Sequence, residues 1–369
     1  MAVRYIQVQT VSNLFSPAVR AYGNIAIIGT ATVVDTTVSS TLFTAPPDIP
    51  KGQFAGDLEN AITTAFKQTP GPTIIYGIPV ATTKPNWATA FNTASTLPVQ
   101  LVVLANTPVP NAGVNVGDPL QLLSDHVTMI SNLDGRERIG VAMLTKGSIK
   151  VSAITANQSM VNERMVYIAH KSDQDAAAAV AGTIAGYEPP VSLLLKPVNI
   201  QTDLFTPSDI ATLNGAETFT SGPNGQGVNW LTSPALLPGG AIYMGEGYTG
   251  NSGGGKKFID IVRTIDDISF KLKARLIQSI GMLRISRAGL RTVIGLLEAV
   301  LEAYVRGDVL GSYDIKIPIL LILDKDPIIR TAAENQILTD AQAKRLIEVQ
   351  VTVKYQAAIH RLSITLKLD

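Results

Sequence analysis

The sequence predicts an α/β fold, in which a mostly parallel sheet covered by helices is followed by an α+β C-terminal domain. Three observations predict it. Short apolar runs rich in β-branched residues alternate with helix-like segments, two long amphipathic helices follow, and the chain closes with two runs of alternating polarity. Strands buried on both faces are continuously apolar, whereas half-buried strands alternate. The two kinds of run therefore indicate two different sheets.

The α/β domain is predicted to span residues 23–198. Its expected strands are IAIIGTATVV (25–34), TIIYGIPV (73–80), VQLVVLAN (99–106), RIGVAMLT (138–145), MVYIAHK (165–171) and VSLLLKP (191–197). The helix-like segments between them include GDLENAITTAFKQ, NWATAFNTA, PLQLLSDHVTMISNL and SDQDAAAAVAGTIAGY. Because helices separate these short apolar runs, we expect a parallel sheet with helices on both faces.

Three further segments complete the organisation. Residues 1–22 form an N-terminal arm, and residues 199–255, rich in Gly, Pro, Ser and Asn, are expected to form a loop-rich junction with short strands such as GVNWLTS and GAIYM. Residues 256–369 are predicted to form the C-terminal α+β domain. Its last strand runs to residue 369 without a proline or bulge that would block its edge, so it is available for pairing with another subunit.

The C-terminal domain begins with the two long helices. The first, from Lys256 to Ile280, has an apolar stripe at helical spacing, and charges at 260, 263, 267 and 271 stand three or four apart. We expect most of these charges to pair along one exposed face. The second runs from about Ala288 to Arg306, buries Leu290, Ile294, Leu297, Leu301 and Tyr304, and ends at Gly307.

The rest of the C-terminal domain is expected to be mainly strand. The run IKIPILLILD (315–324) predicts a strand, and a short helix is expected near 340–345. In the run from Ile347 to Tyr355 the apolar residues are odd-numbered, whereas in HRLSITLKLD (360–369) they are even-numbered. This change of parity predicts a turn or bulge near 356–361.

Composition restricts the classes of function. Hydrophobic residues make up 46% of the 369 residues and charged residues only 16%, a deficit that an extensive subunit interface would explain. With 30 basic and 29 acidic residues and no basic run longer than two, nucleic acid is not an expected partner. The chain has no cysteine, no signal-peptide pattern and no uninterrupted apolar stretch of membrane-spanning length, so we expect a cytoplasmic product.

One motif favours an enzyme. The stretch from Gly250 to Lys256 fits the GxxxxGK phosphate loop, and Asp324 ends an apolar run as a magnesium-holding acid would. However, Lys257 stands where a Ser or Thr should bind the metal, and a second ammonium would repel it. The alternative is a glycine loop with solvated lysines. The stretch from Gly245 to Gly250 also spells GxGxxG, but it is a weak match to a dinucleotide site because the helix starts late and Asp266 and Asp267 fall in its middle. We expect no catalytic, cofactor or metal residues, because the three histidines lie far apart outside any metal motif.

The whole chain resembles the tail sheath proteins of contractile phage tails and related contractile injection systems. Four features carry the resemblance: the arm VRYIQVQTV before IAIIGTA, the α/β domain, the helix beginning KKFIDIVRTIDDISFKLKARLIQ, and the C-terminal pair IEVQVTVKY and AIHRLSITLKLD. The arm lacks the PGVY-like turn common in that family. A tail-tube or ring-forming scaffold is a third candidate, disfavoured because a six-strand α/β domain is not expected there.

The resemblance implies a structural, non-enzymatic subunit without cofactors. Such subunits polymerise as stacked rings around an inner tube and contract to drive the tube through a target membrane. The implied partners are further copies of the chain, the inner tube protein, and baseplate and terminator or cap proteins, without nucleic acid or direct membrane insertion. Assembly would take place in the cytoplasm, giving a phage tail or a contractile particle.

The resemblance also implies that terminal strands are exchanged between neighbouring subunits, as permanent β-augmentation. The residues expected to be buried at these junctions are Val3, Tyr5, Ile6 and Val8 in the arm and Leu362, Ile364, Leu366 and Leu368 in the last strand. Alternatively, the last two runs form a hairpin within one subunit, and both arrangements are compatible. Lys271, Lys273 and Arg275 are candidates for contact with the inner tube.

Overall fold

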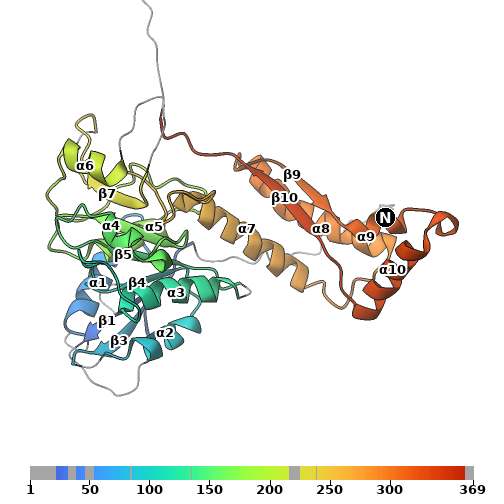
Figure 1. Ribbon diagram of the computed structural model, residues 1–369, viewed down its shortest axis with the longest axis horizontal. Helices are drawn as coiled ribbons and strands as arrows, with labels where there is room; N and C mark the ends of the chain where they lie inside the picture. The colour runs from blue at the N-terminus through green and yellow to red at the C-terminus, as the bar shows by residue number, and fades with distance from the viewer. Residues whose placement is uncertain are drawn as a thin grey trace, which may run out of the picture. The chain divides into compact units, whose positions relative to one another are not determined.

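The computed structural model describes residues 22–31, 39–45, 54–83, 85–133, 135–215, 225–237 and 239–361 (Figure 1). These residues fall into two compact units. The α/β unit holds the described residues of 22–270 together with 308–312 and 354–361, and the helical unit holds 271–307 and 313–353.

The α/β unit is built on an eight-stranded sheet with the strand order β2-β3-β1-β4-β5-β6-β7-β8. Strands β3, β1, β4, β5, β6 and β7 are parallel to one another, and β2 and β8 add antiparallel edges. The strands are β1 (Ile25–Ala31), β2 (Thr41–Phe43), β3 (Ile75–Ala81), β4 (Leu101–Leu104), β5 (Ile139–Met143), β6 (Met165–Ala169), β7 (Val228–Thr232) and β8 (Tyr243–Met244). β4, β5 and β6 are buried throughout, which confirms the predicted parallel sheet.

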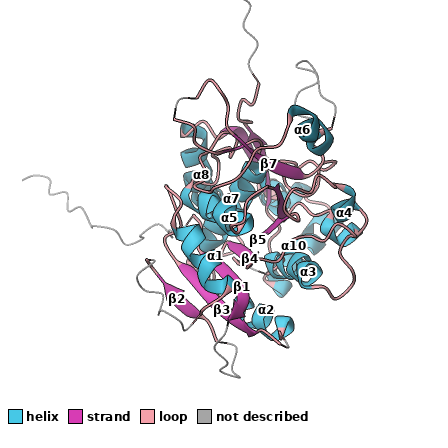
Figure 2. Ribbon diagram, turned by 90° about the vertical axis from the view of Figure 1, so that its left-hand side faces the viewer, coloured by secondary structure: helices cyan, strands magenta, loops and turns pink. Residues whose placement is uncertain are grey.

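Helices cover both faces of this sheet (Figure 2). Side chains of α1 (Asp57–Phe66) and α5 (Ala176–Gly186) share one core with Ile25 and Ile27, whereas α2 (Trp87–Ser95) and α3 (Pro119–Ser131) share the opposite core with Ala26 and Ile28. The alanine-rich α5 is almost wholly buried. A Cβ at its Gly182 would lie 2.4 Å from the carbonyl oxygen of Ala65, so only glycine lets α5 approach α1 this closely. Shorter helices are α4 (Ser152–Thr155), η2 (Gln158–Met160) and α6 (Pro207–Asn214).

Two sequence-based expectations for this unit change. The segment 199–255 is loop-rich, but its β7 continues the parallel sheet beside β6. The predicted strand at 191–197 is wrong: Leu195 turns through a left-handed conformation (φ 56°), and Pro197 makes an isolated bridge with Tyr243. A left-handed residue breaks a strand, and proline cannot donate to a ladder.

Helix α7 (Ile259–Ile277) begins in the α/β unit, and its residues from 271 on belong to the helical unit. Ile259 and Val262 enter the core shared by α1 and α5, as the apolar stripe predicts. The expected exposed charged face is wrong for this half of the helix. Asp260, Arg263 and Asp267 are also buried, because protein surrounds the helix on more than its apolar side.

The helical unit is built around α8 (Arg287–Arg306), which buries Leu290, Leu297, Leu301 and Tyr304, whereas Ile294 is half-buried. The predicted strand at 315–324 is wrong beyond 316. After β9 (Leu310–Lys316), Pro318 starts α9 (Pro318–Leu323), because proline suits the first turn of a helix and lacks a donor for a sheet. The unit continues with η3 (Pro327–Ile329), α10 (Ala332–Lys344) and β10 (Gln350–Tyr355), which pairs with β9.

Two of these later elements refine the sequence-based boundaries. α10 starts well before residue 340, because Thr331 and Glu334 form a capping box at its N-terminus. In β10 the odd-numbered residues are the less exposed ones, which confirms the predicted alternation.

A buried arginine and histidine lie together in the α/β unit. Arg138 is 1% exposed; its Nη1 donates to the carbonyl of Ala94 (2.9 Å) and lies 3.2 Å from Nε2 of His126. Because a guanidinium can only donate, Nε2 is the acceptor and the imidazole is neutral. Burial, and secondly the charge of Arg138, lower the pKa of His126 from 6.5 to about 3.

This lowered pKa predicts acid destabilisation. The unfolded chain binds a proton at His126 near pH 6.5 and the folded chain only near pH 3. The contribution of His126 to stability is therefore complete above pH 6.5. As the pH falls from 6.5 toward 3, this contribution to the free energy of unfolding decreases by up to about 1.4 kcal/mol per pH unit. His126→Gln, which can still accept from Arg138, should flatten this part of the pH dependence of the free energy of unfolding, measured by urea denaturation.

His170 provides an internal control for that measurement. Burial also lowers the pKa of His170, so a shallower acid slope should persist in the His126→Gln variant. A slope equal to that of the unmodified protein would contradict the assignment to His126.

Candidate subunit-linkage site

All eight residues predicted to take part in strand exchange lie outside the described residues. They are Val3, Tyr5, Ile6 and Val8, which precede residue 22, and Leu362, Ile364, Leu366 and Leu368, which follow residue 361. The structure does describe where both terminal segments join the α/β unit. We call residues 22–24 the N-terminal root and residues 355–361 the C-terminal root.

Arg263 of α7 holds the N-terminal root. Its Nη2 donates to the carbonyl oxygens of Tyr22 (3.1 Å) and Tyr187 (2.6 Å), and its Nη1 to that of Glu188 (3.4 Å). Beside it, a Cβ at Gly23 would lie 2.1 Å from Cα of Ala185 in α5. The chain therefore enters the sheet through a fixed point that only glycine can occupy.

Tyr355, at the end of β10, begins the C-terminal root. Its hydroxyl donates to Oδ2 of Asp260 on α7 at 2.5 Å. Burial raises the pKa of the Tyr355 phenol, and the hydrogen bond to Asp260 raises it further. The phenol therefore keeps its proton and acts as the donor.

Glu246 holds the other end of the C-terminal root. Its carboxylate is fully buried; Oε2 lies 3.1 Å from Nδ1 of His360, and Oε1 accepts from Nη2 of Arg361 at 2.6 Å. The His360 ring also places Nε2 2.8 Å from Oγ of Ser192 and lies edge-on to Phe258. A buried carboxylate requires such partners, and here they come from the last two described residues of the chain.

The contacts of Glu246 with His360 and Arg361, which we call the anchor, were not predicted from the sequence. Glu246 lies between two glycines, and at the first of them a Cβ would lie 2.2 Å from Nε1 of Trp230. The loop can therefore pass this indole only with glycine at 245. Two features of the sequence could have indicated the anchor: a single acid in a glycine-rich loop, and a His-Arg pair before the final alternating run. The acid is separated from the histidine by 114 positions and from the arginine by 115.

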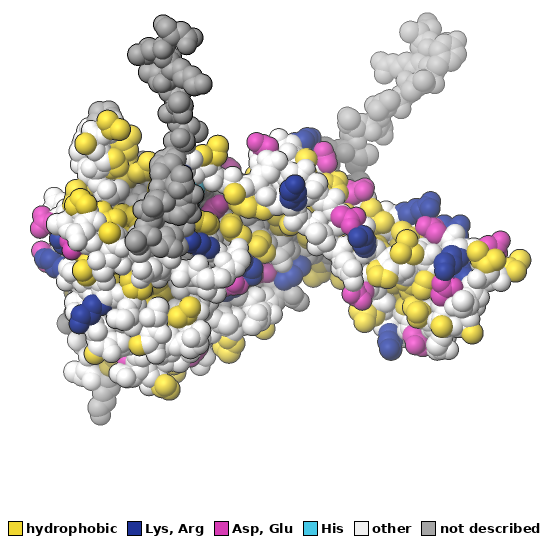
Figure 3. Space-filling model, turned by 45° about the horizontal axis from the view of Figure 1, so that its top comes forward, with side chains coloured by type: hydrophobic (Ala, Val, Ile, Leu, Met, Phe, Trp, Pro, Cys, Tyr) yellow, Lys and Arg dark blue, Asp and Glu magenta, His cyan; other side chains and the backbone are white. Residues whose placement is uncertain are grey.

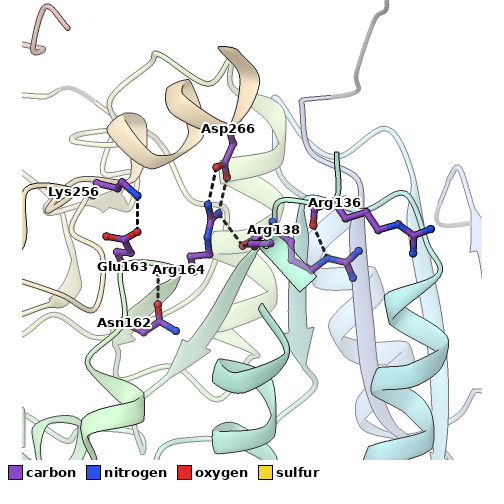
Figure 4. A network of polar contacts seen from close by, with 8 residues as sticks. Arg136, Arg138, Asn162, Glu163, Arg164, Lys256 and Asp266 are labelled. Atoms are coloured by element: carbon purple, nitrogen blue, oxygen red, sulfur yellow. Dashed lines mark hydrogen bonds and ion pairs between the residues drawn. The ribbon is translucent and has the colours of Figure 1, made fainter. Parts of the chain in front are cut away.

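Ion pairs fix the first half of α7 in place (Figure 4). Arg164, just before β6, makes a two-pronged contact with Asp266 at 2.8 and 2.9 Å, and both side chains are largely buried. Lys256 lies 2.7 Å from Glu163. Planar paired contacts of this kind define orientation as well as attraction, so the first half of α7 is held against the sheet in one setting.

The lysine loop lacks the arrangement of a phosphate loop. Lys256 is paired with Glu163, and Nζ of Lys257 lies 5.4 Å from the ring centre of Tyr248. The helix does not begin at the lysines, because Phe258 first bridges to Tyr248. Asp324 ends α9 instead of a strand and is paired with Arg287 and Arg291. The residues of the enzyme alternative therefore have other structural partners.

The candidate tube-contact residues lie on α7 within the helical unit. Nζ of Lys271 lies 4.9 Å from the ring centre of Tyr304, Lys273 is exposed, and Arg275 is half-buried. From Ile268 to Leu297 the chain has six basic residues and no acidic one. Exposed apolar side chains, Ile277, Ile280 and Met282, lie in the same stretch. In Figure 3, hydrophobic side chains appear among charges on the surface of this unit.

Within the described ranges, no set of three or more His, Asp or Glu side chains is arranged to hold a metal ion. No helix among these residues has both the length and the apolarity needed to cross a bilayer.

The chain has the fold of contractile tail sheath proteins, and the match extends over its full length. The helical sheath of the anti-feeding prophage, solved in the contracted state, matches with a TM-score of 0.69 and 12% identity over 100% of both chains. The sheath of PVC, an extracellular contractile injection system, matches in its contracted state with a TM-score of 0.66 and 12% identity, over 100% of this chain and 99% of that one.

A bacterial sheath tail protein solved by crystallography shares the same fold. The sheath tail protein of Desulfitobacterium hafniense matches with a TM-score of 0.58 and 10% identity, over 85% of this chain and 93% of that one. No protein-family model and no curated protein sequence matches the chain.

The anchor at Glu246 is expected to keep the C-terminal root docked on the α/β unit, and this can be tested. Glu246→Gln removes the negative charge opposite Arg361 and should cost about 1.5 kcal/mol, roughly tenfold more undocked chain. We expect trypsin to cleave after Arg361 correspondingly faster, measured by mass spectrometry of released residues 362–369. Glu163→Gln, which breaks the Lys256 ion pair instead, is the matched control. Equal cleavage rates in both variants would contradict the docking role.

Proposed function

We propose that this chain is the structural subunit of a contractile tail sheath, which polymerises as stacked rings around an inner tube and contracts to drive that tube through a target membrane. The observation that carries the proposal is the full-length match to sheath proteins solved in the contracted state. Its partners in this role are copies of itself, the inner tube, and baseplate and terminator or cap proteins. Assembly takes place in the cytoplasm, and the product is a phage tail or an extracellular contractile particle.

Neighbouring subunits are linked by their terminal strands in this proposal. Among the described residues, β9 and β10 pair only with each other, so each has a second edge of backbone donors and acceptors. A strand from a neighbour can add to such an edge. The partners would be the arm with Val3, Tyr5, Ile6 and Val8 and the last strand with Leu362, Ile364, Leu366 and Leu368.

The C-terminal root supports exchange over a hairpin within one subunit. After β10, residues 356–361 form no further strand, and the chain docks on Glu246 at His360 and Arg361. A tight hairpin would have to reverse the chain directly after β10, in the same residues that lead to this anchor.

The anchor also defines the best truncation for testing the function. Removing residues 362–369 spares His360 and Arg361, so the subunit should fold with an unchanged melting temperature. We expect negative-stain images to show long hollow cylinders for the full chain and isolated subunits for the truncated one, because the linking strand is gone. A control with Ser363→Thr and Thr365→Ser keeps the apolar alternation and should still form cylinders. Cylinders from the truncated chain would contradict strand exchange.

The basic stretch of the helical unit supports a tube contact through Lys271, Lys273 and Arg275. Six positive charges without an intervening acid favour an acidic partner surface. Of these three residues Lys273 is the exposed one, whereas Lys271 and Arg275 are half-buried.

Charge reversal at Lys273 tests this contact. Lys273→Glu should weaken co-sedimentation of the subunit with inner tubes isolated from the same particle by roughly five- to tenfold at low salt, with a smaller difference at high salt. Lys316→Glu, which reverses another exposed lysine in the same unit, is the control. A loss of the same size in both variants would argue against a specific contact at Lys273.

A further inference from the structure

The two roots contact the same stretch of α7. Asp260 accepts the hydroxyl of Tyr355 from the C-terminal root, and Arg263 donates to the carbonyl of Tyr22 in the N-terminal root. The two α7 residues are three positions apart, about one helical turn, and are 4% and 6% exposed. Both roots are therefore held within one turn of the same helix.

We propose that this turn of α7 couples the two roots, so that loosening one root loosens the other. Asp260 and Arg263 act as positioning residues. The proposal deepens the proposed function and rests on it for its biological role, because both roots lead into the terminal strands that are proposed to link neighbouring subunits.

The helix between the two contacts is suited to transmit a displacement. Ile259 and Val262 lie in the sheet core, and the paired contact between Arg164 and Asp266 fixes the next turn. Close-packed interiors deform little, and a hydrogen-bonded helix moves as one body. Because this turn behaves as one unit, loss of the Tyr355 contact that loosens Asp260 also loosens Arg263 and its hold on Tyr22.

Three backbone carbonyls converge on Arg263. The guanidinium donates to the carbonyl of Tyr22 and to those of Tyr187 and Glu188, which follow α5 in the chain. A lysine at 263 would keep the charge but could not reproduce this planar set of donors. Arg263→Lys therefore separates the geometry of the contact from its charge.

Hydrogen exchange in the full-length, unassembled subunit tests the coupling. Tyr355→Phe removes the donor to Asp260. We expect it to raise amide exchange by roughly three- to tenfold in peptides covering residues 22–28 as well as those covering 354–361. Arg263→Lys should raise exchange in the same two regions.

Tyr313→Phe is the matched control, since it removes an exposed tyrosine hydroxyl that bonds to Glu302. It should change exchange in neither root. Effects confined to the mutated root would overturn the coupling. If Tyr355→Phe does not fold, the Arg263→Lys variant tests the coupling by itself. Raised amide exchange at residues 354–361 in that variant would support the coupling, and unchanged exchange there would overturn it.

The hydrogen-exchange test of the coupling does not depend on the outcome of the test of the proposed function. Exchange is measured before assembly, whereas sheath function is judged by cylinders of the unmodified protein in micrographs. Absent cylinders with coupled roots would overturn the sheath role and keep the coupling, and cylinders with uncoupled roots would do the reverse.

Discussion

The burial of charge on the first half of α7 is the constraint on which the rest of the α/β unit depends. A helix that places Asp260, Arg263 and Asp266 inside protein must find a partner for each, because an uncompensated buried charge costs several kcal/mol. The partners come from three distant parts of the chain: Tyr355, the carbonyls near Tyr22 and α5, and Arg164. The helix thereby joins segments that the sheet alone would leave unconnected.

The sequence was most informative where burial is continuous. The apolar runs of β1, β3, β4, β5 and β6 predicted their strands because parallel strands covered on both faces tolerate little else. The predictions failed where one residue's backbone overrides an apolar pattern. Leu195 turns a strand-like run through a left-handed conformation, and Pro318 starts a helix inside another such run.

The candidate site was less predictable, for a different physical reason. Helical spacing shows which residues share a face, but not whether further protein covers the polar face. The same spacing that suggested an exposed ladder at Asp260 and Arg263 is compatible with two buried anchors. Glu246 meets its partners only through the tertiary fold, so no local pattern could identify it. At 12% identity or less, the solved sheath proteins share this chain's fold with few of its residues.

The anchor at Glu246 also relates the fold to the direction of protein synthesis. Glu246 is synthesised more than a hundred residues before His360 and Arg361, yet its carboxylate is fully buried in the folded unit. A chain that stops short of residue 360 therefore buries a negative charge without these two partners or leaves that loop open to water. Completion of the α/β unit thus requires the same end of the chain that carries the proposed linking strand. Prematurely terminated chains lack both the linking strand and the contacts that seal the unit from which it emerges.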